Sequence, residues 1–298
     1  MTRVQANLLL LLAGAIWGMG FVAQATAMDT IGPLLFVGLR FLVATLCVLP
    51  FVLRESSKAA LPLKRTQWLA FVWVGLMLFG AITAQQFGLL TTSVTNSGFL
   101  TGLYVVLTPI LGVVLFRQFP HVVVWPAALC ALTGIFLLSG GTLTGLSTGD
   151  WLTIIGAAFC SLQVIFIARS AAQTGRPITL AATQFAVCGI IGTSAALVFE
   201  PISVQAINGA AKEILYAGIF SGGLAFTLQV VGQRYTTASQ AAIFLSSEAV
   251  FAALFGAIFL HERLPSAALG GCALILASML VVEIVPAVWR RKAARLTP

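Results

Sequence analysis

Apolar residues occur in long runs along this chain, and short polar segments separate the runs. A helix needs about 20 mostly apolar residues to cross the hydrocarbon core of a bilayer. Because lipid offers no hydrogen-bond partner to the backbone, each run is expected to cross as a helix that satisfies its own backbone groups. The pattern therefore predicts an all-α polytopic membrane protein with ten transmembrane helices, at residues 6–28, 32–53, 67–88, 92–116, 122–140, 151–169, 178–199, 212–233, 236–260 and 265–285.

The first half of the chain aligns with the second half after a shift of 144 residues, without a gap from about residue 7 to residue 138. The clearest stretch pairs Ala81-x-Thr83-x-Gln85-x-x-Gly88-x-x-x-Thr92 with Ala225-x-Thr227-x-Gln229-x-x-Gly232-x-x-x-Thr236, and Pro33 and Phe41 match Pro177 and Phe185. Five spans per half is an odd number, so the two copies have opposite orientations in the membrane. We expect one integral membrane domain of two inverted five-helix repeats, residues 1–144 and 145–298. Such repeats are typical of transporters whose site lies between the halves.

Composition and charge agree with this class. The chain is 59% apolar and 8% charged, with a mean hydropathy of +1.04, which leaves too little polar surface for a water-soluble domain. Of its 16 Lys and Arg residues, 13 fall on the side of the two termini, Lys212 and Arg263 fall on the other side, and Arg40 lies within the second span. Because cytoplasmic loops hold the excess of positive charge, we expect a bacterial-type inner membrane protein with cytoplasmic termini. The net charge of +8 then faces anionic lipid rather than nucleic acid.

The N-terminus also has features of a cleaved signal peptide, since Arg3 precedes an apolar run and Ala23-Gln24-Ala25 has the form of a cleavage site. The run from Ala6 to Val22 is long for a signal core, and its repeat mate lies in the middle of the chain. We therefore expect residues 1–28 to remain.

Few residues suit reaction chemistry or a cofactor. The cysteines Cys47, Cys130, Cys160, Cys188 and Cys272 all lie in predicted spans without a CxxC or Cys/His pairing, which indicates small core residues. His121 and His261 lie on opposite sides of the membrane, so no shared metal site is expected. No Walker-type glycine-rich lysine loop occurs. The sequence predicts neither a metal, nor a cofactor, nor ATP hydrolysis.

Several short motifs occur together along the chain. They are Ala15-Ile16-Trp17-Gly18 in the first span, Pro33 followed by Arg40-Phe41 in the second, and Phe259-Leu260-His261-Glu262-Arg263-Leu264 at the end of the ninth. With ten spans in two repeats, this combination resembles the EamA family of the drug/metabolite transporter superfamily over nearly the whole chain. The resemblance implies export of amino acids and small metabolites, and a central cavity walled by helices 1–4 and 6–9. The first half departs from the pattern, because the fourth span ends in Arg117-Gln118-Phe119.

Polar residues inside a bilayer are costly unless they find partners or water, so they are the candidates for the cavity wall. In the fourth span Asn96, Ser97, Thr101 and Tyr104 recur at steps of three and four, which places them on one helical stripe. They line the cavity or bond to neighbouring helices, and both interpretations stay open. Tyr104 favours lining, since a phenol offers a ligand both a ring face and a hydroxyl.

The ninth span carries Phe244, Ser247 and Glu248 on the corresponding face. Glu248 is the one carboxylate near the middle of a predicted span, at the repeat position of Tyr104. A central ionisable residue is a functional hypothesis, here a coupling site for protons. The alternative is a structural ion pair with Arg40. The coupling role and the ion pair are compatible if Glu248 and Arg40 pair in one state of the transport cycle and separate in another.

Other spans add aromatic and amide side chains. Trp17, Phe21 and Gln24 share one face of the first helix at i, i+4 and i+7, where they line the cavity or simply pack. Further amides are Gln85, Gln86, Gln163, Gln184 and Gln229. Amides and hydroxyls hold a zwitterion or a neutral polar solute by hydrogen bonds. In the fourth helix, Pro109 and the nearby glycines Gly98, Gly102 and Gly112 suggest a hinge, or else the neighbouring helices accommodate the proline without motion.

The sequence therefore predicts a secondary or facilitative transporter that exports amino acids, including bulky or aromatic ones, by alternating access. Its expected partners are a small-molecule substrate and the lipid bilayer, and a monomer is plausible. The alternative is an exporter of drugs or other metabolites that is coupled to protons through Glu248. A membrane enzyme would need clustered His, Asp or Cys side chains at an interface, and a scaffold would predict two unrelated halves.

Overall fold

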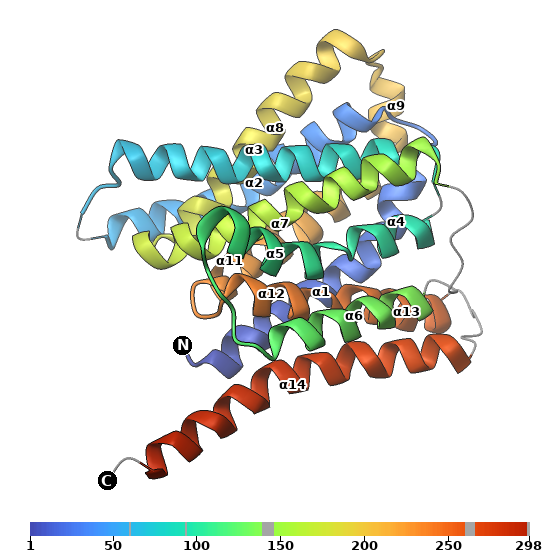
Figure 1. The fold of residues 1–298 in the computed structure, drawn as a ribbon. Coiled ribbons are helices and arrows are strands. Elements are labelled where there is room, and N and C mark those ends of the chain that lie inside the picture. Colours follow the sequence, from blue (N-terminus) through green and yellow to red (C-terminus); the bar gives the residue numbers. More distant parts are fainter. Residues whose placement is uncertain (60, 93, 139–145, 260–265, 297–298) are drawn as a thin grey trace.

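The computed structural model describes residues 1–59, 61–92, 94–138, 146–259 and 266–296, which form a helical bundle with both termini at one end (Figure 1). Within these residues the secondary structure is helical and contains no strand. The motif residues His261, Glu262 and Arg263 lie outside the described part. The helices are α1 (Arg3–Ala27), α2 (Pro33–Ser57), α3 (Arg65–Gly88), α4 (Val94–Thr101), α5 (Tyr104–Phe116), α6 (Val124–Leu138), α7 (Thr148–Thr174), α8 (Pro177–Phe199), α9 (Val204–Gly209), α10 (Ala211–Tyr216), the π-helix η1 (Ala217–Phe226), α11 (Thr227–Gln233), α12 (Ala238–Leu245), α13 (Ser247–Phe259) and α14 (Ser266–Leu296).

In the described residues, nine helical stretches are long and apolar enough to cross a membrane. A tenth, α6, is apolar but has only 15 residues, and the predicted span 122–140 continues past it into residues outside the described part. Each stretch overlaps one predicted span, because lipid-facing and core-facing positions are both apolar. Three spans are built from more than one element: α4 and α5 form the fourth, α10, η1 and α11 the eighth, and α12 and α13 the ninth.

The repeat mates α2 and α8 run antiparallel, as an inverted repeat requires, and their backbones touch at Gly38 and Gly192. A Cβ atom on Gly192 would lie 2.9 Å from the Cα atom of Gly38, and a Cβ on Gly38 would lie 2.5 Å from the backbone nitrogen of Thr193. Real Cβ atoms do not approach so closely, so glycine is required at this crossing.

Two carboxylates join the ends of this helix pair reciprocally. The side chain of Glu200, just past the C-terminus of α8, accepts hydrogen bonds from the N–H groups of residues 34–35 at 2.8 and 2.9 Å. The side chain of Glu55, near the C-terminus of α2, accepts from the N–H groups of residues 178–179 at 3.0 and 2.8 Å. Residues 34–35 and 178–179 are equivalent under the 144-residue shift. Each helix of the pair therefore satisfies first-turn donors of the other, at opposite ends of the bundle.

The remaining contacts follow the same twofold relation. α3 packs along α7, and its equivalent, the segment η1–α11, packs along α1. α6 packs along α14, and these two helices lie together along one edge of the bundle (Figure 1). The fifth and tenth spans are therefore peripheral, as the family resemblance implies.

The fourth and ninth spans are each interrupted near their middle, at positions that match under the same shift. α4 gives way to α5 at residues 102–103, and α12 gives way to α13 at residue 246. Around residues 103–106, N–H groups bond to carbonyls three rather than four residues earlier, at 3.0 to 3.2 Å. A tightened turn inside a helix often marks a hinge. Gly102, one of the glycines that the sequence suggested for a hinge, lies at this interruption, whereas α5 continues through Pro109 and Gly112.

Replacing Gly38 by alanine should force the α2–α8 crossing apart. We expect Gly38→Ala to lower the free energy of unfolding by the ~1–3 kcal/mol typical of overpacking. The midpoint of thermal unfolding in detergent should fall accordingly. Gly270 in α14 is the matched control, since a Cβ there meets no atom within 4 Å, so Gly270→Ala should leave the midpoint unchanged or higher. Equal losses in the two variants would contradict a tight crossing.

The carboxylate caps predict a reciprocal pattern of hydrogen exchange. Glu200→Ala should speed amide exchange at residues 34–35 and leave residues 178–179 protected, whereas Glu55→Ala should do the opposite. An N–H group that loses a charged acceptor loses about 1–3 kcal/mol of stabilisation. Asp29, an exposed carboxylate after α1, is the control, and Asp29→Ala should change neither region. Uniform acceleration in both Glu variants would show global destabilisation instead of specific caps.

Candidate functional site

A cavity of about 70 Å³ lies between helices of the two halves. The lining residues come from the first four spans and from the sixth, eighth and ninth. In the part of the chain that the structure describes, α8 supplies none of them, so the seventh span contributes less than the resemblance implied. The predicted site residues on the wall are Trp17, Phe21, Gln24, Arg40, Gln85, Thr101, Tyr104, Gln163, Gln229 and Glu248.

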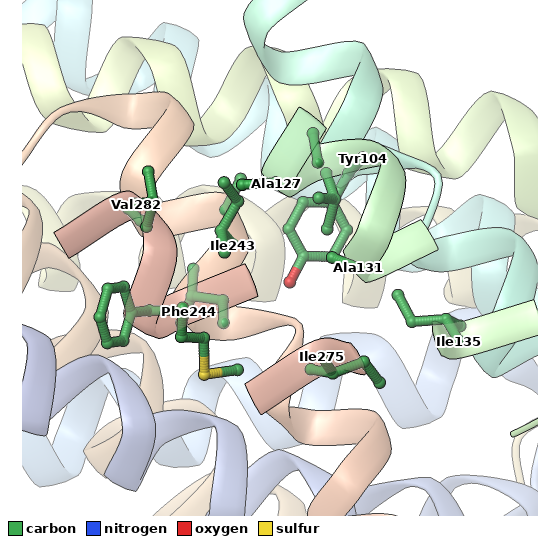
Figure 2. Close-up of a cluster of buried hydrophobic side chains, with 14 of the residues drawn as sticks. Tyr104, Ala127, Ala131, Ile135, Ile243, Phe244, Ile275 and Val282 are labelled. Carbon is green, nitrogen blue, oxygen red and sulfur yellow. The ribbon is translucent and has the colours of Figure 1, made fainter. Parts of the chain in front are cut away.

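The other predicted residues do not reach the wall. Gln86 is buried and donates through Nε2 to the backbone oxygen of Gln24 at 3.1 Å. Ser97 and Ser247 are buried with hydroxyls that find no hydrogen-bond partner among the described residues. Phe244 is buried in a hydrophobic cluster with side chains of α6 and α14 (Figure 2). The side chain of Asn96 lies outside the described part of the chain.

The wall also contains residues that the sequence analysis did not select, chiefly Leu78, Ile82, Cys160, Phe226 and Leu245. These residues are apolar or weakly polar, and nothing in a membrane sequence separates an apolar residue beside a cavity from one beside lipid or another helix. Polarity was the signal used for selection, so these positions were missed.

An aromatic group forms one part of the wall. The ring centroids of Trp17 and Phe226 lie 4.6 Å apart, and Phe41 lies behind Phe226 with centroids 5.9 Å apart. The indole Nε1 of Trp17 donates to the backbone oxygen of Ser221 at 3.1 Å. Ser221 belongs to the π-helix η1, and π-helical turns are frequent at functional sites. This hydrogen bond holds the indole in place and leaves its ring to the cavity.

Amide side chains form a second part of the wall. Nε2 of Gln163 donates to Oε1 of Gln184 at 3.1 Å and lies 3.4 Å from Oε1 of Gln229. Gln184 is therefore a support behind the wall and not a lining residue. In the other half, Nε2 of Gln85 donates to the hydroxyl of Thr101 at 2.9 Å. Gln85 and Gln229, which are repeat mates, line the same cavity from opposite halves.

Arg40 and Glu248 bring a basic and an acidic side chain to the cavity, but they do not form the ion pair that the sequence offered as an alternative. Arg40 is 2% exposed and Glu248 is 9% exposed. Neither belongs to an ion pair with a nitrogen–oxygen distance of 4.0 Å or less in the described residues. Nη1 of Arg40 instead donates to Oε1 of Gln24 at 2.9 Å. Its guanidinium carbon also lies 4.9 Å from the ring centroid of Phe41, a cation–π distance.

Glu248 lies at the start of α13, beside the interruption of the ninth span. Tyr104 and Cys160 line the same cavity. Tyr104 is 3% exposed, and its hydroxyl has no hydrogen-bond partner in the described part. Figure 2 shows Tyr104 against the side chains of Ala131 and Ile243, so this residue separates the cavity from the peripheral helix pair. Within the described ranges no three His, Cys, Asp or Glu side chains gather as a metal site.

The cavity is small beside the ~300–1,000 Å³ of pockets that enclose drug-sized ligands. A solute with an aromatic side chain therefore fits only after the walls move apart. The interruptions between α4 and α5 and between α12 and α13 lie directly on the wall, next to Tyr104 and Glu248. Discontinuous helices at corresponding places in two repeats are typical of a binding site at the membrane midplane.

The chain is similar to known proteins in sequence and in fold. The chain matches the model of the EamA-like transporter family twice, over residues 4–140 and 147–284. An uncharacterized transporter from Archaeoglobus fulgidus is 31% identical over 282 residues, which cover 95% of this chain and 87% of that protein. A solved structure described only as "Crystal structure of protein" aligns over 100% of both chains with a TM-score of 0.79 and 19% identity. The last similarity concerns the fold alone.

Cys160 gives a direct test of the cavity. In a variant that keeps Cys160 and replaces the other four cysteines by alanine, a solute that fills the cavity should slow alkylation by N-ethylmaleimide. Phenylalanine is a suitable solute, since the wall offers it rings and amides. Cys47 is exposed on α2 and outside the cavity wall, so a Cys47-only variant should react at the same rate with or without phenylalanine. Shielding of both thiols, or of neither, would contradict a solute site here.

Proposed function

The chain belongs to the EamA-like transporter family, and from this premise we propose that it exports amino acids, including bulky and aromatic ones, and related small metabolites across the membrane. The observation that carries the proposal is the chemistry of the cavity wall. Rings, side-chain amides and two opposite charges face one space between the repeats, as an amphipathic solute requires. The role of these residues is to bind and orient a solute rather than to catalyse a reaction.

Each part of the wall suits one part of such a solute. The rings of Trp17 and Phe226 present an apolar surface to a bulky side chain. Gln85, Gln163 and Gln229 supply donors and acceptors for polar groups without fixing a net charge. One buried cation, Arg40, is a poor match for a phosphate ester, which usually engages several Lys or Arg side chains.

We further propose that transport proceeds by alternating access. The antiparallel helices α2 and α8 come from different halves, and caps at both of their ends hold them together. This pair would therefore stay joined while the other helices move apart at one end of the bundle or the other. The interrupted fourth and ninth spans supply the bends. The boundary between the moving repeats would fall near residues 144–145. The excess of Lys and Arg on the side of the termini supports a cytoplasmic location for both ends, in an inner membrane of bacterial type.

A second candidate function is proton-coupled export of drugs or other metabolites. The observation that favours it is Glu248, a buried carboxylate that lines the cavity without an ionic partner in the described residues. Ionisable residues inside a membrane often belong to proton pathways. The two candidates differ in the solute and in the energy source, and the following measurement separates them.

Purified protein in liposomes should take up phenylalanine and other bulky amino acids with saturable kinetics. Under the first candidate a proton gradient changes the rate little. Under the second candidate uptake of a drug panel depends on the gradient, and Glu248→Gln removes that dependence. Glu213→Gln is the control, because Glu213 lies in α10 and outside the cavity wall. Folded protein that moves no amino acid would refute the first candidate.

A further inference from the structure

The cavity holds one basic and one acidic side chain, Arg40 and Glu248, that do not pair with each other. Arg40 and Glu248 both line it, both are more than nine-tenths buried, and no ion pair joins them or links either to another side chain in the described residues. A charge held away from water is costly unless an opposite charge and hydrogen bonds compensate it. A ligand that carries both a negative and a positive group would compensate both.

We propose that Arg40 and Glu248 form a two-point site for a zwitterionic α-amino acid. The guanidinium of Arg40 binds the α-carboxylate, and the carboxylate of Glu248 binds the α-ammonium group. The side chain of the amino acid then lies against Trp17 and Phe226. This inference rests on the proposed function and specifies which part of the solute each charged residue recognises.

The geometry around Arg40 leaves donors for such a ligand. Among the described residues, the one hydrogen bond of its guanidinium runs from Nη1 to the amide oxygen of Gln24 at 2.9 Å, and Nε is buried there without a hydrogen-bond partner. The rings of Phe36 and Phe41 lie 5.3 and 4.9 Å from the guanidinium carbon, and a flat guanidinium packs well against such rings. The group is thereby held in position with a forked set of donors that matches a carboxylate.

The surroundings of Glu248 suit a cationic group in the same way. Tyr104 and Cys160 line the same cavity as Glu248, and neither brings a positive charge. The hydroxyl of Tyr104 is buried without a partner among the described residues. An ammonium group has three donors, so the cavity offers it two kinds of acceptor, the carboxyl oxygens of Glu248 and the phenol oxygen of Tyr104.

The repeat shows that the fold does not need these charges. Under the 144-residue shift, Arg40 corresponds to Gln184 and Glu248 corresponds to Tyr104. Gln184 is fully buried and accepts a hydrogen bond from Gln163. The second repeat therefore packs with a neutral side chain at the position equivalent to Arg40. A charge required by the packing of the inverted repeat would be expected in both halves. Each charge occurs once, and both face the cavity.

The test measures recognition by shielding of Cys160 from N-ethylmaleimide in detergent, with Cys160 as the sole cysteine. Three probes are compared: phenylalanine, phenylalaninamide, which lacks the carboxylate, and 3-phenylpropionate, which lacks the ammonium group. The protein with its native Arg40 and Glu248 should be half-shielded by phenylalanine at a concentration at least ~10-fold lower than by either analogue, because each analogue leaves one of these two buried polar groups without its partner.

The two substitutions should then have crossed effects. Arg40→Gln should abolish the preference for phenylalanine over phenylalaninamide and keep the preference over 3-phenylpropionate. Glu248→Gln should do the reverse. If either substitution raises all three half-shielding concentrations by the same factor, the residue is structural and the two-point site is wrong. Arg40→Lys and Glu248→Asp keep the charges and should keep both preferences, which covers the case in which a neutral variant fails to fold.

Matched controls come from charges outside the cavity. Arg176 pairs with Glu55, with a distance of 3.6 Å between Nε and Oε2, and Asp150 caps the start of α7 through Ser147. Arg176→Gln and Asp150→Asn should leave both preferences unchanged. Uptake into liposomes is measured in parallel. Saturable uptake without crossed effects would overturn the two-point site and leave the proposed export intact, whereas crossed effects without uptake would leave the site and overturn export.

Discussion

The antiparallel contact between α2 and α8 is the interaction on which the rest of the bundle depends. Gly38 and Gly192 let the two backbones touch, and the side chains of Glu55 and Glu200 satisfy first-turn N–H groups at the two ends. Leu34, Leu35 and Thr179 are buried, and a buried backbone donor without an acceptor is costly, so these caps stabilise both ends of the pair. The pair carries Arg40 at the level of the cavity and orients every helix packed around it.

Around this symmetric pair the chemistry is asymmetric. Equivalent amides, Gln85 and Gln229, reach the cavity from both halves, but the cation and the carboxylate each occur once. The twofold relation between the two repeats would allow either end of the bundle to open by the same motion, as expected for inverted repeats. In the two-point site that we propose, this asymmetry would give a bound solute a defined orientation. Such a transporter would be symmetric in its motion and specific in its binding.

Much of the fold followed from the sequence because membranes limit the choices. Apolar runs of about 20 residues cross as helices, and the 144-residue repeat with five spans per half requires inversion. The interruption at residue 246 was not foreseen, since Ser246 has no sequence feature that separates it from serines inside continuous helices. In the fourth span the sequence pointed to Pro109 and the glycines around it, Gly102 among them, but not to which of these residues interrupts the helix, and α5 continues through Pro109.

The sequence by itself determined the class of protein, the repeat, and the short set of polar residues from which a site could be built. Only the tertiary structure decided which of them share a cavity, because that depends on the rotation of each helix about its axis and on the nearest partner. Gln86 turns to the backbone of Gln24, Gln184 supports Gln163 from behind, and Arg40 bonds to Gln24 instead of Glu248. Residues with equal polarity thus differ in role, because a polar group inside a membrane takes whichever partner packing brings within hydrogen-bond distance.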